Sequence, residues 1–457
     1  MKAKNKAVVL GANYYIGLSV IRCLGREGVR VAAVDYESEN AYAFRSKYCS
    51  EKLIGPHYKE EPEAFLDFLI DYGKRQEAKP VLFPCADPYV EFIDRHFEPL
   101  KEHYLFPQTE KGLFTRAMNK DSLMEMAERF GVRVPETVRI SGREEKKEDE
   151  KENERAKRLP PCHVGDEKAE DRKSEDEFAP AGEKEPDSKV REKEPNRKIR
   201  EKEPDYIRET EERIGYPCIV KPTDSPAFVS LFRRKIFKVH NRHELIEAVS
   251  RAQEAGLEVF VQRIIPGFDD HMYTFDAHMD QNAEVTHWTT CQKFRQYPIN
   301  FGASVYTTQR HVPELYEIGA KFFKDIGFKG FAEIEFKKDE KTGEFYLIEI
   351  NVRTTNFNAM LDKVGLNMPY LTYREMTGEP IGKKAVTEDT GVTFWYAFED
   401  FFASMDYIRQ RQLSPWKIMA SLFRKKACAI WDVKDMAPFF YHQKLLLQKA
   451  GRKIKKR

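Results

Sequence analysis

The sequence predicts a chain of mixed α/β and α+β class, in which a Rossmann-like α/β domain precedes a larger α+β domain. Two observations support this prediction. Near the N-terminus, short apolar runs alternate with amphipathic stretches, which is the pattern of a doubly wound parallel sheet. Further on, residues 331–356, FAEIEFKKDEKTGEFYLIEINVRTTN, alternate apolar and polar side chains on both sides of a polar turn, which is the pattern of an antiparallel hairpin.

Composition indicates a protein of several domains in a reducing compartment. The chain has 457 residues, and its 77 basic and 75 acidic residues give a net charge of +2, so no overall field favours nucleic acid. Its seven cysteines form no CxxC pair, which argues against a disulfide framework or a structural zinc site. The first apolar run is too short for a signal peptide, and no run approaches the length of a membrane span. We therefore expect a cytoplasmic protein.

Residues 1–112 are expected to form the α/β domain. An apolar run at Ala7–Leu10 is followed by GANYYIG, residues 11–17, a helical pattern ending at Gly28, and a second strand over 29–34. The dinucleotide fingerprint needs a second glycine two residues after the first, but position 13 is Asn, so a nicotinamide cofactor is disfavoured. Four more elements are expected: a helix at 65–72, a strand at 80–84, a helix at 87–96 and a strand at 104–106.

A charged insertion interrupts the second domain, which is expected to comprise residues 113–142 and 206–385. Residues 143–205 are mostly Glu, Lys, Arg, Asp and Pro, with a nine-residue repeat in EKEPDSKVR, EKEPNRKIR and EKEPD. Such a segment has too little apolar surface to offset the entropy of ordering, so we expect disorder; a docking arm for a charged partner stays open as an alternative. Residues 386–457 form a helical and aromatic extension with a basic end.

The second domain divides into the following expected elements: a helix at 115–130, a strand at 215–222, a loop at 223–229, a helix at 242–255, strands at 259–265, 267–280 and 283–294, and helices at 314–326 and 362–377.

The hairpin contains the candidate metal-ligating residues. One face is expected to be apolar: Ala332, Ile334 and Phe336 on the first strand, and Tyr346, Ile348, Ile350 and Val352 on the second. The other face holds Glu333, Glu335, Glu349, Asn351 and Arg353. Clustered carboxylates and an amide are hard oxygen ligands for Mg²⁺, and an arginine suits an anion, although a solvated hairpin face remains the alternative at this point.

Taken together, these features resemble the ATP-grasp superfamily and its N-terminal preATP-grasp domain. The matching segments are a helix-borne lysine, YPCIVKP, VFVQRIIPG, and IEF followed by IEINVR. The resemblance implies that the chain uses ATP with Mg²⁺, or Mn²⁺ in its place. The residue roles it implies are metal ligation by Glu335, Glu349 and Asn351, catalysis by Arg353 and Lys221, phosphate binding by Lys120 and Lys221, and adenine binding by Gln262, Arg263 and Ile265.

One segment departs from the family pattern. The loop over the phosphates is usually rich in glycine, but here it is TDSPAFVSLFRRK, residues 223–235, which contains none. Either Ser225, Ser230 and the basic cluster from Arg233 to Lys235 replace the backbone contacts, or the lid has lost its function. The leading expectation is therefore a carboxylate-amine ligase, and the alternative is a catalytically impaired ATP-binding scaffold or sensor.

Within the superfamily the chain looks most like carboxylate-amine ligases of the D-aspartate ligase type and carbamoyl-phosphate-synthase-like proteins, on the strength of AIWDVKDMAPFF, with its Asp-x-x-Asp-x-x-Pro pattern, and of PCADPYVEFI. This resemblance implies amide formation through an acyl phosphate, with an amino acid and a peptidoglycan precursor as substrates and a homodimer as the assembly. The basic C-terminus would suit peripheral membrane contact. Candidates for substrate specificity are Asn13, Asp87, Asn356 and Asn358.

Overall fold

The structure is a computed structural model that describes residues 4–108, 110–140, 204–223 and 225–455. Nearly all of the predicted charged insertion, residues 143–203, lies outside this part of the chain. The chain divides into two compact units, one comprising Met1–Glu136 with Arg263–Arg457 and the other Thr137–Gln262.

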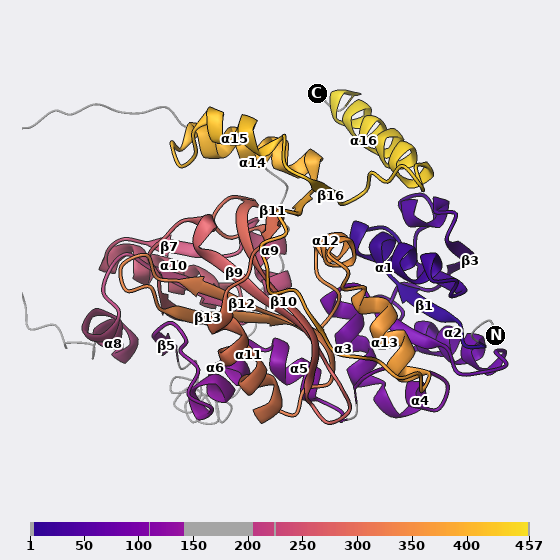
Figure 1. The fold of residues 1–457 in the computed structure, drawn as a ribbon. Helices are drawn as coiled ribbons and strands as arrows, with labels where there is room; N and C mark the ends of the chain where they lie inside the picture. The colour runs from indigo at the N-terminus through magenta and orange to yellow at the C-terminus, as the bar shows by residue number, and fades with distance from the viewer. Residues whose placement is uncertain (1–3, 109, 141–203, 224, 456–457) are drawn as a thin grey trace, which may run out of the picture. The chain divides into compact units, whose positions relative to one another are not determined.

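The first unit begins with a parallel four-stranded sheet, drawn in indigo and violet around β1 and β3 in Figure 1. The strand order of this sheet is β3-β2-β1-β4. Its strands are β1 (Ala7–Leu10), β2 (Val31–Asp35), β3 (Cys49–Ile54) and β4 (Val81–Pro84). The helices that follow them are α1 (Tyr15–Arg26), α2 (Pro62–Lys74), α3 (Asp87–Arg95) and α4 (Phe97–Lys101), with a 3₁₀ helix at Tyr42–Arg45. The central strands β1 and β2 are buried throughout, as apolar runs in a sheet covered on both faces should be. The predicted α/β class is confirmed, but the strand expected at 104–106 is only a single bridge between Leu105 and Val81.

Gly11, after β1, and Gly17, in the first turn of α1, have a structural reason that involves no ligand. Gly11 has a φ of +102°, in the region that favours glycine. A Cβ on Gly17 would lie 1.9 Å from the carbonyl oxygen of Gly11. The start of α1 therefore approaches the preceding turn too closely for any other residue.

The helix expected at 115–130 is two helices, α5 (Leu113–Met118) and α6 (Lys120–Arg129). Asn119 lies between them with extended backbone, and its side chain accepts hydrogen bonds from the backbone N–H groups of Asp121 and Ser122. An asparagine N-cap satisfies the free N–H groups at a helix start, so this side chain begins α6 and sets the direction of its first turn.

The larger sheet of the first unit follows the path β13-β12-β9-β10-β11-β15-β16, with β14 paired to β10. Its strands are β9 (Met272–Met279), β10 (Val285–Tyr297), β11 (Ala303–Gln309), β12 (Gly330–Lys338), β13 (Phe345–Asn351), β14 (Lys384–Ala385), β15 (Thr393–Trp395) and β16 (Lys426–Cys428). Helix α11 (Pro313–Asp325) packs on its apolar face, where Phe275, Phe323 and Phe336 are fully buried. The expected hairpin is β12 and β13, and Gly343 in its turn has a φ of +76°.

The strict alternation predicted for the second hairpin strand is wrong. The register is regular from Glu333 opposite Asn351 to Glu335 opposite Glu349, but Phe336 then lies opposite Leu347, so Ile348 forms a β-bulge. The bulge reverses the alternation. Phe345 and Leu347, rather than Tyr346 and Ile348, share the apolar core with Ile350 and Val352.

The helices after the hairpin are α12 (Asn358–Lys363), α13 (Met368–Met376), α14 (Ala397–Arg409), α15 (Pro415–Ser421) and α16 (Ala437–Lys455). The single helix predicted at 362–377 is therefore wrong. Helix α12 ends at Lys363, inside the predicted range, and a separate helix, α13, begins at Met368. The Asn367 side chain caps the start of α13 by accepting from the Tyr370 N–H. No helix in the described ranges is both long and apolar enough to cross a membrane.

The Asp-x-x-Asp-x-x-Pro segment anchors the C-terminal part of the chain to α1. Asp435 is buried and accepts hydrogen bonds from Arg22 Nε at 2.9 Å and Ser46 Oγ at 2.7 Å. Asp432 forms an ion pair with Arg26, which also contacts Asp362 at 2.7 Å. In this chain the two aspartates of the motif hold tertiary structure together.

The second unit is a four-stranded sheet in the order β5-β8-β6-β7 with three helices. Its elements are β5 (Thr137–Arg139), α8 (Asp205–Arg213), β6 (Cys218–Pro222), α9 (Ser225–Phe232), β7 (Phe237–Val239), α10 (Arg242–Glu254) and β8 (Val259–Arg263), whose last residue belongs to the first unit. The loop expected at 223–229 is wrong, because α9 begins within it at Ser225. Phe228 supplies the reason: it is fully buried and packs against Phe232 and Phe237, which favours one helical turn between Phe228 and Phe232.

Candidate functional site

The polar face of the larger sheet is a cross-strand ladder of acids. Glu333 on β12 lies between Asn351 on β13 and Asp276 on β9. One pair further along the ladder, Glu335 lies between Glu349 and Thr274. Directly opposite side chains in a sheet are close neighbours, so the hairpin and β9 concentrate four carboxylates on one face. Glu333 and Glu335 are buried, whereas Glu349 is exposed at the edge strand.

A lysine from β10 neutralises part of this charge. Lys293 is buried, and its Nζ forms an ion pair with Glu335 Oε1. The Asn351 Nδ2 donates to Glu333 Oε1 at 2.7 Å and to Glu335 Oε1 at 3.2 Å. Because the amide nitrogen faces the two glutamates, the amide carbonyl is the end that would meet a cation.

Burial dominates the electrostatics of this face. It raises the pKa of Glu333 to about 7, with the charge of Asp276 adding to the effect. It also raises the pKa of Glu335 to about 8, although Lys293 opposes the change. Burial would lower the pKa of Lys293, but Glu335 and Glu333 outweigh it and raise that pKa well above its ordinary value. The face therefore favours a cation and penalises uncompensated carboxylates.

The donor set on this face fits a divalent cation such as Mg²⁺. Glu333 Oε2 and Asp276 Oδ1 are buried and have no hydrogen-bond partner in the described part of the chain. Such orphaned oxygens are costly unless an ion or water meets them. Within the same residues, no group of three or more His, Cys, Asp and Glu side chains is arranged to hold a metal ion, and Lys293 lies on Glu335 instead. The metal role predicted for Glu335, Glu349 and Asn351 stays a prediction.

Arg353 follows the hairpin and meets the edge of the parallel sheet. Its Nε donates to Asp87 Oδ1 at 2.6 Å and its Nη2 to Asp87 Oδ2 at 3.3 Å, a two-point contact with the first residue of α3. Desolvation opposes its charge, but Asp87 raises the pKa of the guanidinium above its usual value. Arg353 is thus a permanent cation already arranged to grip a carboxylate.

The phenol of Tyr14 interacts electrostatically both with this arginine and with an acid, Glu399. Burial raises the pKa of Glu399, on α14, to about 7. Burial, followed by the charge of Glu399, raises the pKa of Tyr14 to about 12, and Arg353 acts in the opposite direction. The Tyr14 ring packs against Tyr15 at 4.2 Å between centroids. Groups of both signs therefore surround the loop between β1 and α1.

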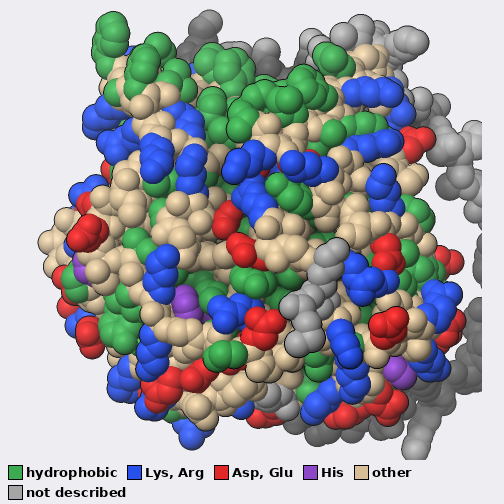
Figure 2. All heavy atoms as spheres, turned by 45° about the vertical axis from the view of Figure 1, so that its right-hand side comes forward, with side chains coloured by type: hydrophobic (Ala, Val, Ile, Leu, Met, Phe, Trp, Pro, Cys, Tyr) green, Lys and Arg blue, Asp and Glu red, His purple; other side chains and the backbone are tan. Residues whose placement is uncertain are grey.

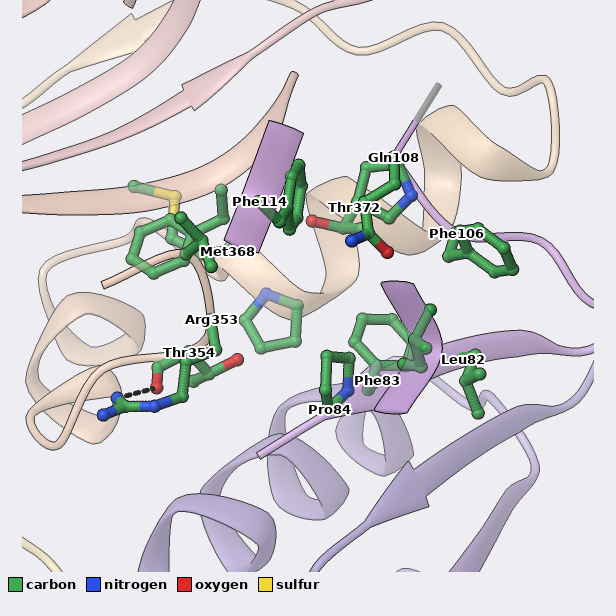
Figure 3. Close-up of a pocket in the computed structure, with 15 residues that line it drawn as sticks. Leu82, Phe83, Pro84, Phe106, Gln108, Phe114, Arg353, Thr354, Met368 and Thr372 are labelled. Atoms are coloured by element: carbon green, nitrogen blue, oxygen red, sulfur yellow. Dashed lines mark hydrogen bonds between the residues drawn. The ribbon is translucent and has the colours of Figure 1, made fainter. Parts of the chain in front are cut away.

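A hydrophobic cavity lies behind Arg353, and Figure 3 shows its lining. Leu82, Phe83 and Pro84 come from β4, Phe114 comes from α5, and Met368 and Thr372 come from α13. The guanidinium of Arg353 points away from these side chains and donates to the carbonyl oxygen of Thr354 at 3.2 Å (Figure 3). This cavity is a packing gap between secondary-structure elements, and the charged groups face elsewhere.

In the second unit the structure brings two predicted site residues together. Lys221 on β6 donates from Nζ to Gln262 Oε1 on the neighbouring strand β8 at 3.1 Å. Gln262 in turn donates from Nε2 to Thr137 Oγ1 on β5 at 3.1 Å. The lysine is held at the end of an otherwise apolar strand, as the sequence predicted.

The remaining candidates are more scattered. Lys120 begins α6, and Ser230 is exposed on α9. Arg233 is exposed just after α9 with a φ of +56°, a left-handed helix end. Arg263 is engaged by Glu136 through two contacts of 3.1 Å, and Ile265 is buried. Their predicted ATP contacts stay predictions.

Sequence reasoning missed Lys293 and Asp276 and gave Glu399 no role. A lysine at 293 on the face shared with Thr289 and Cys291 was a signal, because a charged residue in a long strand is rarely buried without a partner. Of the specificity candidates, Asp87 is held by Arg353. Asn358 is fully buried and donates to Ser19 Oγ at 3.1 Å, so it lies between α12 and α1.

The chain is similar in sequence to known ligases. Residues 192–372 match the family model described as D-ala D-ala ligase C-terminus. The chain is 24% identical over 356 residues to D-aspartate ligase of Enterococcus faecium, covering 76% of this chain and 69% of that protein. It is 27% identical over 156 residues to D-alanine–D-alanine ligase of Thermoanaerobacter sp., covering 32% of this chain and only 41% of that protein.

The fold has solved counterparts. The biotin carboxylase domain of 2-oxoglutarate carboxylase from Hydrogenobacter thermophilus, solved with MgADP, ADP and bicarbonate, aligns with a TM-score of 0.56 at 17% identity. The alignment covers 86% of this chain and 74% of that chain. The chain therefore resembles ATP-grasp proteins in its fold, and the relatives that it matches in sequence are carboxylate-amine ligases.

Proposed function

We propose that the protein joins a carboxylate to an amine at the expense of ATP, with Mg²⁺ held on the acid face of the hairpin. The observation that carries the proposal is the ladder of Glu335 opposite Glu349 beside Glu333 opposite Asn351. Hard oxygen donors of this kind are suited to a metal that carries nucleotide phosphates. When bound, Mg·ATP would supply the γ-phosphoryl group that converts the carboxylate into an acyl phosphate.

The residues of the chain would supply binding and charge balance. Glu335, Glu349 and Asn351 would hold the metal, and Lys293 would hold the buried Glu335 in place and favour its ionised form. Lys221, fixed by Gln262, would bind phosphate oxygens together with Lys120. Gln262, Arg263 and Ile265 would line the adenine pocket, and Ser230 and Arg233 would stand in for the missing glycines of the lid.

The charged groups around the β1–α1 loop suggest the substrate chemistry. Arg353 would exchange Asp87 for the carboxylate or phosphoryl group of the substrate, since its two-point contact has the geometry of carboxylate recognition. Glu399 is near enough to Tyr14 to raise its pKa, and it would bind an ammonium group. A cation and an acid that both act on Tyr14 suit a free amino acid as one substrate. The second would be a small-molecule carboxylate such as a peptidoglycan precursor.

In the proposed reaction a carboxylate oxygen attacks the γ-phosphorus and the bond to the ADP oxygen breaks. The neutral amine then attacks the acyl carbon, phosphate leaves with its bonding pair, and the nitrogen gives up one proton to solvent. The products are an amide, ADP and phosphate. Arg353 would stabilise the negative charge as it moves from the phosphoryl group to the acyl oxygen.

Release of ADP tests the proposal. The purified chain with ATP, Mg²⁺ and a panel of D- and L-amino acids and peptide carboxylates should release ADP and phosphate. Glu349→Gln should lower that rate about 100-fold or more, because it removes a charged metal ligand. Glu340→Gln, on the exposed turn of the same hairpin, is the matched control and should leave the rate unchanged. ADP release that survives Glu349→Gln would refute the site assignment.

A second candidate is an ATP-binding scaffold or sensor without turnover. The observation that favours it is α9, a helix where the family pattern places a glycine-rich loop, with no glycine in residues 223–235. A helix offers its interior N–H groups to its own carbonyls, so few remain for phosphates. Calorimetry that finds tight Mg·ATP binding, with no ADP released on any substrate pair, would support this candidate over the ligase.

A further inference from the structure

Helix α14 has its apolar side turned outward. Five side chains at helical spacing, 36–63% exposed, lie on one face: Phe398, Phe401, Phe402, Met405 and Ile408. The opposite side is buried and polar. Asp400 binds Arg295 through contacts of 2.5 and 2.8 Å, and Tyr407 contacts Asp269. This arrangement is the reverse of the usual surface helix, so the outward face calls for an apolar occupant.

The next helix extends the same kind of surface. On α15 and just after it, Trp416 is 82% exposed and Phe423 is 86% exposed, with Met419 and Leu422 also exposed. Figure 2 shows hydrophobic side chains gathered at the top of the molecule with Lys and Arg side chains beneath them. We use the name α14–α15 face for the nine side chains Phe398, Phe401, Phe402, Met405, Ile408, Trp416, Met419, Leu422 and Phe423.

The charge around this face has one sign. Residues 409–426 contain six basic residues and no acidic one. Five of the basic side chains are exposed: Arg409, Arg411, Lys417, Arg424 and Lys425. Of the acids on α14, Asp400 is buried, Glu399 is half-buried, and Asp406 is paired with Arg409.

We propose that the α14–α15 face docks on an anionic lipid bilayer, with Trp416 and Phe423 inserted at the headgroup level and the basic residues against lipid phosphates. Exposed aromatic side chains next to exposed basic ones are the composition of interfacial membrane anchors. A second copy of the chain is the less suitable occupant, because a twofold contact would bring like charges together.

Vesicle binding by the full chain tests this proposal. Co-sedimentation is measured with vesicles of phosphatidylcholine alone and of phosphatidylcholine with about 30 mol % phosphatidylglycerol. The chain should pellet with the anionic vesicles only, and added salt should release it. The double variant Trp416→Ser with Phe423→Ser should weaken binding about tenfold or more, and Lys417→Gln with Arg424→Gln should weaken it also.

Phe268→Ser provides the control, because Phe268 is 54% exposed and lies outside the α14–α15 face. Its vesicle binding should equal that of the unchanged chain, and far-ultraviolet circular dichroism should show all variants folded. Equal binding to neutral vesicles, or binding unaffected by the aromatic double variant, would overturn the proposal. A third outcome would also overturn it: the chain does not bind lipid, analytical ultracentrifugation shows an oligomer, and the aromatic double variant dissociates that oligomer.

Discussion

Replacing Asp435 by alanine should loosen the C-terminal segment from α1. The carboxylate accepts from Arg22 Nε at 2.9 Å, from Ser46 Oγ at 2.7 Å and from the Lys47 N–H at 3.0 Å. Only 1% of the Asp435 side chain and 6% of the Arg22 side chain are exposed. The substitution therefore leaves a buried guanidinium without its counter-charge.

The size of the loss follows from what Arg22 keeps. Removing one partner of a buried ion pair costs about 3–5 kcal/mol. Arg22 still donates to the carbonyl oxygens of Ile430 at 2.9 Å and of residue 435 at 2.7 Å, and Asp432 remains 4.0 Å away. We therefore expect the lower end, about 3 kcal/mol, for Asp435→Ala, and about half of that for Asp435→Asn, which removes the charge but keeps the shape.

Hydrogen exchange of the backbone amides in residues 430–436 is the direct assay, because a chain with two units need not unfold in a single step. Urea unfolding followed by tryptophan fluorescence should show the same order of stability, with Asp435→Ala less stable than Asp435→Asn and both less stable than the unchanged chain. Asp406→Ala, which removes an exposed ion pair with Arg409, is the control and should change stability by less than about 0.5 kcal/mol. A loss below about 1 kcal/mol for Asp435→Ala would refute a buried, charge-compensating role.

Two further substitutions test the hairpin site and the β1–α1 turn. Lys293→Met should lower the free energy of unfolding by about 3 kcal/mol in thermal unfolding, because it leaves Glu335 buried without its partner. Adding Glu335→Gln should recover part of this loss. If the losses of the two single variants simply add in the double variant, the pairing is contradicted. Gly17→Ala should lower the free energy of unfolding by about 1–3 kcal/mol, because its Cβ would meet the Gly11 carbonyl oxygen. Gly382→Ala is the control and should leave the stability unchanged, because a Cβ there would lie in open space. Equal effects of the two substitutions in urea unfolding would contradict this crowding.

Local patterns in the sequence predicted much of the fold. Apolar runs predict β1, β2 and β4, and the polar residues with Gly343 predict the hairpin turn. The errors occurred where a specific side-chain contact overrode the hydrophobic pattern. The Asn119 cap divides one expected helix into two, and the packing of Phe228 against Phe237 forms α9 where a loop was expected.

For the site, the sequence by itself determined which residues carry chemistry: the acids of the hairpin, Lys221 at the end of an apolar strand, and Arg353 after β13. These follow from residue type and period-two spacing, which are local properties. Only the tertiary structure decided their partners. Lys293 meets Glu335, Asp87 meets Arg353 and Arg22 meets Asp435, each across a long stretch of chain. The order of the strands and the packing of the helices determine these pairs, and burial then shifts the pKa values of the paired groups. A local sequence pattern therefore cannot predict them.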